Sequence, residues 1–72
     1  MMGLMTYLDG SKLKRLRIGR GFSQRELAQE AQMSPSTIVL LEKKTHNEGF
    51  HPSTVRKLSE ALGVDPDDFL KD

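Results

Sequence analysis

Basic side chains are concentrated in the first third of this chain, where they could bind phosphate groups. Residues 1–25 carry six cations and one acid, Asp9, which gives this part a net charge of +5 (six minus one). The six cations are Lys12, Lys14, Arg15, Arg17, Arg20 and Arg25. Residues 26–72 carry five basic and nine acidic groups, or −4. This asymmetry indicates either an electropositive face for a phosphate-bearing ligand or an ordinary solvated helix surface.

Other kinds of chemistry have little support in the sequence. The chain has no cysteine, so it can form neither a disulfide nor a thiolate zinc site, and it lacks a cysteine nucleophile. His46 and His51 are too few for a structural zinc site, which normally needs four ligands. Neither histidine has a carboxylate partner by motif, and the acids at 65–68 fit helix capping better than catalysis. We therefore expect no enzyme activity, no metal and no cofactor.

The N-terminal segment MMGLMTYLDG does not have the features of a targeting sequence. It contains no basic region and no apolar run long enough for a signal peptide or a membrane span. We therefore expect a soluble cytoplasmic protein with no membrane partner.

The segment 23–42, SQRELAQEAQMSPSTIVLLE, predicts two short helices joined by a tight turn. Ser23 and Glu26 have the spacing of a capping box, in which each side chain satisfies a backbone N–H of the other residue. A second helix start follows at Ser34-Pro35, a good capping residue before a proline at the first helical position. Because only Gln32 and Met33 lie between the helices, the two must cross steeply, as in a helix-turn-helix.

The apolar pattern of the whole chain predicts an all-α fold, a compact five-helix bundle without strands. The other three helices are expected over about 11–19, over 52–62, and in a short segment that starts at Pro66 behind an Asp65 cap. We expect residues 1–10 to form a flexible arm and residues 11–72 to form one domain. Its core is expected to contain the apolar residues at helical spacing, namely Leu13, Leu16, Ile18, Phe22, Leu27, Ala28, Ala31, Ile38, Leu41, Val55, Leu58, Leu62, Phe69 and Leu70.

The order of these segments resembles a known family. The segments that carry the resemblance are LKRLR at 13–17, GFSQRELA at 21–28, SPSTIVLLE at 34–42, PSTVRKLSEALGV at 52–64 and DDFL at 67–70. Together they resemble the Cro/repressor-type helix-turn-helix domains of the xenobiotic-response-element family, which are lambda-repressor-like. The resemblance implies a sequence-specific regulator of transcription, a repressor, that binds double-stranded DNA with the helix at about 34–43 in the major groove. One departure is Gln32, at a turn position that is usually glycine in the family. A left-handed conformation there costs on the order of 1 kcal/mol.

The resemblance also implies which residues contact base edges: Pro35, Ser36, Val39 and Leu40. The helical step supports part of this set, because an inner face with Ile38 and Leu41 places Ser36 and Leu40 outside. An apolar Leu40 could contact a thymine methyl group, which would favour A·T-containing sites. The alternative is that Val39 and Leu40 pack against another protein or against the core.

Contacts to phosphate are implied for Ser23, Gln24, Thr37, Lys43, Lys44, Thr45 and Asn47. Gln24 lies in the first turn of a helix, where backbone N–H groups are also free to meet a phosphate. Glu48 departs from the family, in which this loop is often basic, and should weaken binding or turn away from DNA. For Arg20 and Arg25, a phosphate contact and an ordinary surface position remain open. Arg17 and Glu42 are implied to form a structural ion pair that ties the first helix to the end of the third.

The expected partners are double-stranded DNA and a second copy of the chain, because relatives bind as symmetric pairs to half-sites about 34 Å apart. We expect the homodimer interface between Gly63 and Leu70, where exposed apolar groups could associate. The alternative function is a protein-interaction module, such as the antitoxin of a toxin–antitoxin pair, which could also bind its own operator. Binding driven by phosphate contacts should weaken steeply with salt, whereas an apolar protein contact should not.

Overall fold

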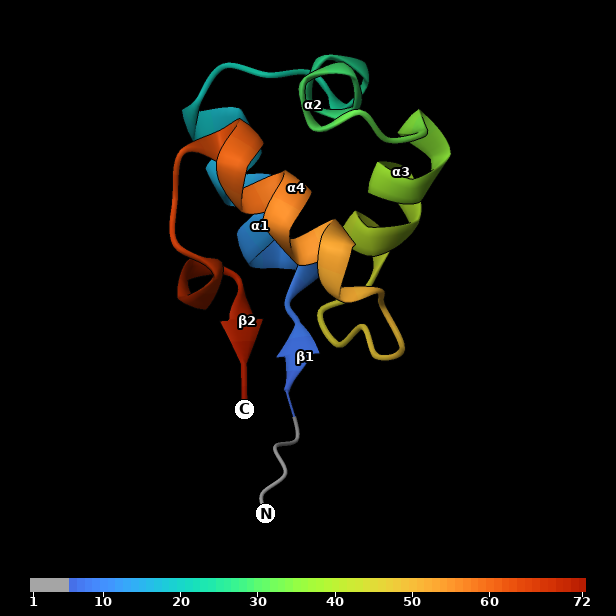
Figure 1. Cartoon of the computed structure of the whole chain (residues 1–72), viewed down its shortest axis with the longest axis vertical. Coiled ribbons are helices and arrows are strands. Elements are labelled where there is room, and N and C mark those ends of the chain that lie inside the picture. The colour runs from blue at the N-terminus through green and yellow to red at the C-terminus, as the bar shows by residue number, and fades with distance from the viewer. Residues whose placement is uncertain (1–5) are drawn as a thin grey trace.

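Four α-helices pack around one core in the computed structural model, which describes residues 6–72 (Figure 1). The helices are α1 (Gly10–Gly19), α2 (Gln24–Ala31), α3 (Pro35–Lys43) and α4 (Pro52–Leu62). A 3-10 turn, η1 (Pro66–Asp68), follows α4. Two short strands, β1 (Tyr7–Leu8) and β2 (Leu70–Lys71), lie side by side at the lower end of the molecule in Figure 1. Helix α2 packs against both α3 and α4, and α1 packs against α3.

The core is formed by apolar side chains that the helical spacing predicts, with one addition from β1. The buried apolar residues are Leu8, Leu13, Leu27, Ala28, Ala31, Ile38, Leu58, Leu62 and Phe69. The prediction for Ile18 was wrong, because its side chain is 58% exposed. Ile18 is five residues from Leu13, or about 140° around the helix, and therefore lies on the solvent side of α1.

The expected fifth helix is absent from the described chain, and two strands that were not expected are present. The segment after Asp65 forms only the three-residue turn η1. Phe69 then leaves the helical conformation at φ −132° and buries its ring in the core. This redirects the backbone so that Leu70 pairs with Leu8, and Lys71 with Tyr7, in an antiparallel ladder. In this ladder, backbone groups of β2 form hydrogen bonds with β1. In a longer helix, the same groups would have formed hydrogen bonds within the helix.

Part of the segment 1–10, expected to be a flexible arm, belongs to the fold. Leu8 is fully buried, and its backbone exchanges two hydrogen bonds with Asn47, at 2.9 and 3.0 Å. Helix α1 begins at Gly10, one residue before the expected start. Residues 1–5 of the expected arm lie outside the described residues.

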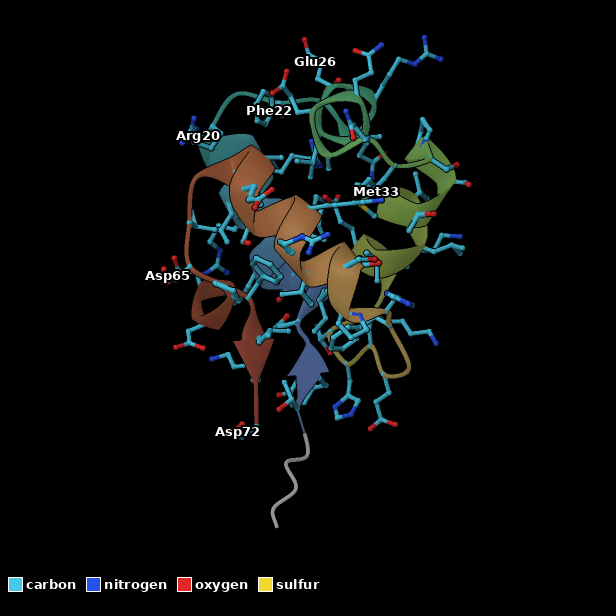
Figure 2. The ribbon with its side chains drawn as sticks, in the orientation of Figure 1. Arg20, Phe22, Glu26, Met33, Asp65 and Asp72 are labelled. Carbon is cyan, nitrogen blue, oxygen red and sulfur yellow. The ribbon has the colours of Figure 1, made fainter. Side chains whose placement is uncertain are left out.

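The start of α2 and the turn between α2 and α3 have the predicted local geometry. Ser23 and Glu26 form both hydrogen bonds of the capping box, at 3.0 and 2.8 Å. Gln32 ends α2 in the left-handed conformation, at φ 56° and ψ 50°. Met33 then packs against the core from between the two helices (Figure 2). A non-glycine residue, Gln32, therefore occupies the strained position, and the next residue, Met33, packs against the core.

Helix α1 begins behind an acidic cap that the sequence analysis did not identify. Asp9 Oδ1 accepts hydrogen bonds from the Ser11 hydroxyl at 2.7 Å and from the N–H groups of Ser11 and Lys12 at 3.0 and 3.3 Å. The Ser11 hydroxyl is the main cause that lowers the pKa of Asp9 below 3.8, and the two N–H groups add to it, although partial desolvation opposes them. The ionised carboxylate is therefore the form that stabilises the helix start.

Replacing Asp9 with alanine should lower the free energy of unfolding at pH 7 by about 1 kcal/mol, as is typical for the loss of a helix N-cap. Because the pKa of Asp9 is lower in the folded state than in the unfolded state, its contribution is present above pH 3.8 and is lost as the pH falls through the folded-state value. Urea unfolding of both proteins at pH 7 and at about pH 2.5 measures this difference. If the wild-type protein and the alanine variant differed as much in free energy of unfolding in acid as at neutral pH, the proposed role of the carboxylate would be contradicted.

Candidate nucleic-acid interface

Helix α3 presents one face to the core and the opposite face to solvent. Ile38 is fully buried and Leu41 packs against the core. The exposed residues Pro35, Ser36, Leu40 and Lys43 form what we call the outer strip of α3. Leu40 is 62% exposed, whereas Val39 is half-buried at the margin of the strip. All four predicted base-contacting residues therefore lie on or beside the outer strip.

The outer strip has few polar groups with which to bind base edges. Pro35 and Leu40 have no polar side-chain atoms, and the Ser36 hydroxyl is hydrogen-bonded to the Ser34 hydroxyl at 2.9 Å. Ser34 occupies the predicted capping position of α3, but its side chain makes no capping bond to the helix. Lys43, at the end of the strip, is its one charged group. The strip is therefore mainly an apolar surface that ends in a cation.

A buried ion pair holds the C-terminal end of α3 against α1 and α2. Arg17 Nε and Nη2 donate to the two carboxylate oxygens of Glu42 at 2.7 and 3.0 Å, and the side chains are 10% and 3% exposed. Arg17 also donates to the carbonyl oxygen of Phe22 at 2.8 Å. Gln24 Nε2 donates to Glu42 Oε1 at 3.1 Å, a contact that was not predicted. These bonds fix the start of α2 relative to the outer strip, because Gln24 is the first residue of α2.

The residues predicted to contact phosphate are distributed around α3. Ser23, Lys43, Lys44 and Thr45 are exposed, while Gln24 and Thr37 are half-buried. A hollow of about 210 Å³ lies where α1, α2 and α3 meet, lined by Lys14, Gln24, Val39, Glu42 and Lys43. Lys14 was not singled out in the sequence analysis, although it belongs to the basic cluster of residues 12–25. The structure thus brings a cation of α1 beside the predicted residues of α2 and α3.

Asn47 has a structural role that leaves its side-chain amide little capacity to bind phosphate. Its Nδ2 donates to the carbonyl oxygens of Leu8, Leu41 and Lys44, at 3.1, 2.9 and 3.1 Å. These bonds tie β1 and the end of α3 to the loop between α3 and α4. In the same loop, Glu48 contacts His46 at 2.7 Å, and the His46 ring stacks on Tyr7. We therefore do not retain Asn47 among the proposed phosphate contacts.

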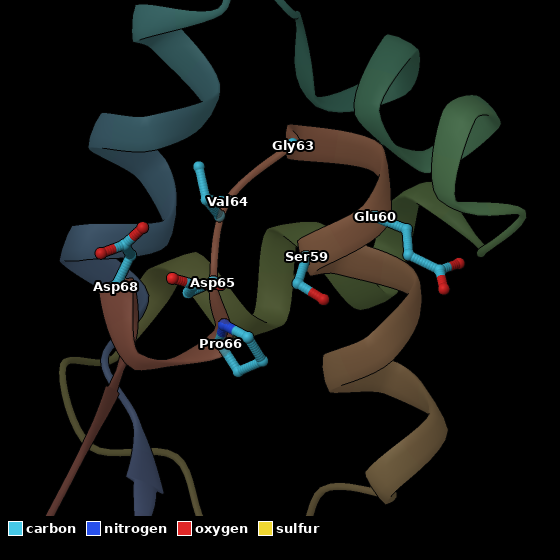
Figure 3. A pocket seen from close by; sticks show the side chains of 7 residues that line it. All are labelled: Ser59, Glu60, Gly63, Val64, Asp65, Pro66 and Asp68. Atoms are coloured by element: carbon cyan, nitrogen blue, oxygen red, sulfur yellow. The ribbon is translucent and has the colours of Figure 1, made fainter.

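The C-terminal end of α4 and η1 form an acidic surface. A hollow of about 520 Å³ is lined by Ser59, Glu60, Gly63, Val64, Asp65, Pro66 and Asp68 (Figure 3). Asp65 lies on the opposite side of the view from α3 in Figure 2. The lining contains the carboxylates of Glu60, Asp65 and Asp68 and no cation, and none of the predicted DNA-contacting residues lines this hollow.

The expected apolar dimer surface between Gly63 and Leu70 does not have the predicted exposure. Phe69 is fully buried, and Val64 and Leu70 are half-buried against the core. The exposed side chains of this segment include Asp65, Asp67 and Asp68. Arg20 lies near its start, where it donates to the carbonyl oxygen of Leu62 at 2.9 Å. This contact gives Arg20 a structural role in joining the ends of α1 and α4 (Figure 2).

Comparison with known families identifies the type of domain. A family model described as a helix-turn-helix domain matches residues 10–72. The chain belongs to this helix-turn-helix family. The model covers α1 to β2, so the arrangement of α2, the left-handed Gln32 and α3 described above is the motif that gives the family its name. A comparison with functionally curated proteins found no match.

Solved structures place this helix-turn-helix protein with Cro/repressor-type regulators. It is similar to the restriction-modification controller protein C.AhdI from Aeromonas hydrophila, with 27% identity, a TM-score of 0.72, and coverage of 82% of this chain and 86% of that one. It is also similar to SinR, a master regulator for biofilm formation solved in complex with DNA, with 26% identity, a TM-score of 0.73, and coverage of 81% and 90%.

The fold also occurs within a larger enzyme. Hydroxyethylphosphonate dioxygenase shares 23% identity with this helix-turn-helix protein, with a TM-score of 0.76 over 90% of this chain. The match spans 14% of the dioxygenase chain and shows a common fold alone. Within residues 6–72 of this helix-turn-helix protein, no helix has the length and apolar character needed to cross a membrane.

Proposed function

We propose that this helix-turn-helix protein is a sequence-specific regulator of transcription that binds double-stranded DNA with α3 in the major groove and acts as a repressor by covering promoter DNA. The observation that carries the proposal is the outer strip of α3, which is exposed while Ile38 fixes the opposite face in the core. An α-helix with its side chains is about as wide as the major groove. The similarity to C.AhdI, a controller protein, and to SinR, solved with DNA, supports this function.

In the proposed complex, the base contacts come from Pro35, Ser36, Val39 and Leu40. Phosphate contacts come from Ser23, Gln24, Thr37, Lys43, Lys44 and Thr45, with Lys14 added because it borders the same hollow as Gln24 and Lys43. The outer strip carries no arginine, asparagine or glutamine, and its one side chain able to make a bidentate contact with guanine is Lys43, at its C-terminal end. Direct discrimination between bases is therefore modest, and A·T pairs are favoured where Leu40 meets the DNA.

One recognition helix contacts only a few base pairs, so we propose that two copies bind together. A symmetric pair would place two α3 helices in successive major grooves, about 34 Å apart. The segment between Gly63 and Leu70 offers little exposed apolar surface for self-association, because Phe69 is buried and Val64 and Leu70 are half-buried. The dimer therefore requires a contact elsewhere or a shared DNA site that holds the two copies side by side.

Selection of binding sites from a random duplex library tests the function. We expect an enriched palindromic site, and Ser36→Ala and Leu40→Ala should change its base composition because both residues lie on the outer strip. Lys44→Ala should instead weaken binding to all sequences alike and reduce the slope of log K against log salt by about 0.9. Glu60→Ala, on the acidic surface, is the matched control and should leave the enriched site unchanged. Failure to enrich any sequence, together with no binding at low salt, would contradict the proposal.

A protein-interaction module, such as an antitoxin, is the second candidate function. The observation in its favour is the 62% exposure of Leu40 beside Val39, an apolar pair that could bind a partner protein. The salt dependence of binding separates the two candidate functions. An apolar protein contact changes little with salt, whereas phosphate contacts weaken steeply.

A further inference from the structure

We propose that Leu40 recognises the C5-methyl group of pyrimidines in the major groove, so that the protein binds duplexes carrying this methyl group more tightly, whether it belongs to thymine or to 5-methylcytosine. This inference rests on the proposed DNA-binding function and names the chemical group that the outer strip detects.

The side chain of Leu40 is purely apolar, which restricts the chemical groups that Leu40 can recognise. Of the residues that the structure describes, Ile18 and Leu40 are the large hydrophobic residues with exposed side chains, and only Leu40 lies on α3. A leucine has no donor or acceptor, so the polar edge of a base covered by it would lose water without gaining a hydrogen bond. The C5-methyl group is the apolar group that a base pair presents in the major groove. Contact with a methyl group is therefore the favourable use of Leu40 in this groove.

The neighbours of Leu40 do not add strong discrimination between thymine and 5-methylcytosine. Both bases carry the methyl group on C5, and they differ in the exocyclic group, an acceptor O4 in thymine and a donor N4 in cytosine. Ser36 lies one turn before Leu40, and its hydroxyl can donate or accept but is already hydrogen-bonded to Ser34. Lys43 lies three residues after Leu40, where its long, flexible cationic side chain suits a phosphate. The strip thus responds to the methyl group more than to the base pair that carries it.

The cations at the C-terminal end of the strip and beside Val39 favour DNA over an apolar protein surface as the occupant. Lys43 and Lys44 are exposed at the C-terminal end of α3, and Lys14 borders the hollow beside Val39. The one acid that lines this hollow, Glu42, has its carboxylate bound to Arg17 and Gln24. An apolar side chain on a helix face that ends in cations complements a groove whose floor carries methyl groups and whose edges carry phosphates.

The experiment uses the duplex enriched by selection and changes only its methyl groups. Each thymine is replaced in turn by deoxyuridine, which pairs identically but lacks the methyl, and each cytosine by 5-methylcytosine. Fluorescence anisotropy at one fixed, low salt concentration gives Kd for the full chain. We expect deoxyuridine at one position of each half-site to weaken binding about four-fold per methyl group, the size expected for burying one such group. A 5-methylcytosine·guanine pair at that position should restore the affinity that an unmethylated cytosine·guanine pair loses.

Variants assign the effect to Leu40. Leu40→Ala should bind thymine and deoxyuridine duplexes equally, whereas Leu40→Met, which keeps a large apolar side chain, should retain the difference. Ile18→Ala removes the exposed hydrophobic residue of α1 and should also retain the difference in affinity between thymine and deoxyuridine duplexes. Equal affinity of the wild-type protein for thymine and deoxyuridine duplexes would overturn the inference while leaving DNA binding intact. The inference would also fail if Leu40→Ala still bound the thymine duplex more tightly than the deoxyuridine duplex. If no duplex is enriched or bound at low salt, the proposed function fails and the inference fails with it.

Discussion

Gly10→Ala is expected to destabilise the domain strongly. A Cβ atom at Gly10 would lie 1.9 Å from the carbonyl oxygen of Leu41 and 2.2 Å from that of Lys44. Both contacts are with backbone, which cannot turn aside as a flexible side chain would. The Gly10 N–H also donates to the Lys44 carbonyl at 3.1 Å, so relief of the clash would break this bond and separate α1 from the end of α3.

We expect Gly10→Ala to lower the free energy of unfolding by about 3 kcal/mol or more, at the upper end of the effect of overpacking. Urea denaturation followed by circular dichroism measures the change. Gly19→Ala is the matched control, because Gly19 ends the same helix and a Cβ there would meet nothing within 4 Å. It should be neutral or slightly stabilising, since alanine is the better helix former. Equal stability of Gly10→Ala and the wild-type protein would mean that the approach of α1 to α3 is looser than the structure shows.

Arg17→Ala is expected to destabilise the protein by about 3–5 kcal/mol, because it leaves the Glu42 carboxylate buried without its cation. The Glu42 side chain is 3% exposed, and Arg17 donates two of the three side-chain hydrogen bonds that its carboxylate accepts. The Phe22 carbonyl would lose a donor in the same variant. Such a loss is a large part of the 5–15 kcal/mol that stabilises a typical domain.

The same denaturation measurement should show a much smaller loss for the double variant Arg17→Met/Glu42→Leu, because no buried charge remains. Arg15→Ala, an exposed cation on the same helix, should change stability by less than about 0.5 kcal/mol. If Arg17→Ala cost no more than Arg15→Ala, the ion pair would contribute nothing to the fold.

Features that depend on neighbouring residues could be predicted from the sequence. The capping box of Ser23 and Glu26 and the start of α4 at Pro52 are set by local hydrogen bonds and by the fixed backbone angle of proline. The outward direction of Ser36 and Leu40 followed from the helical step once Ile38 was placed in the core. The pairing of Arg17 with Glu42 came from family resemblance, since nothing local relates residues 25 positions apart.

Features that depend on distant partners were missed or misassigned. The ladder between Leu8 and Leu70 involves two-residue strands, which are too short to leave an alternating pattern in the sequence. Asn47 was assigned to phosphate because a polar loop residue looks the same in sequence whether its amide meets solvent, DNA or backbone carbonyls. Only the fold shows that its amide reaches Leu8, Leu41 and Lys44.

The pairing of β1 with β2 has a consequence for the order of folding events. Tyr7 pairs with Lys71, so this contact closes a loop of 64 positions (71 minus 7), nearly the whole described chain. Closing so long a loop costs more entropy than any helical turn, while two-residue strands return few hydrogen bonds. We therefore expect the strands to join after the helices have packed and brought both segments together. The two ends of the described chain are then joined late, whereas the hydrogen bonds of Asn47 and Glu42 that brace the end of α3 do not depend on β2.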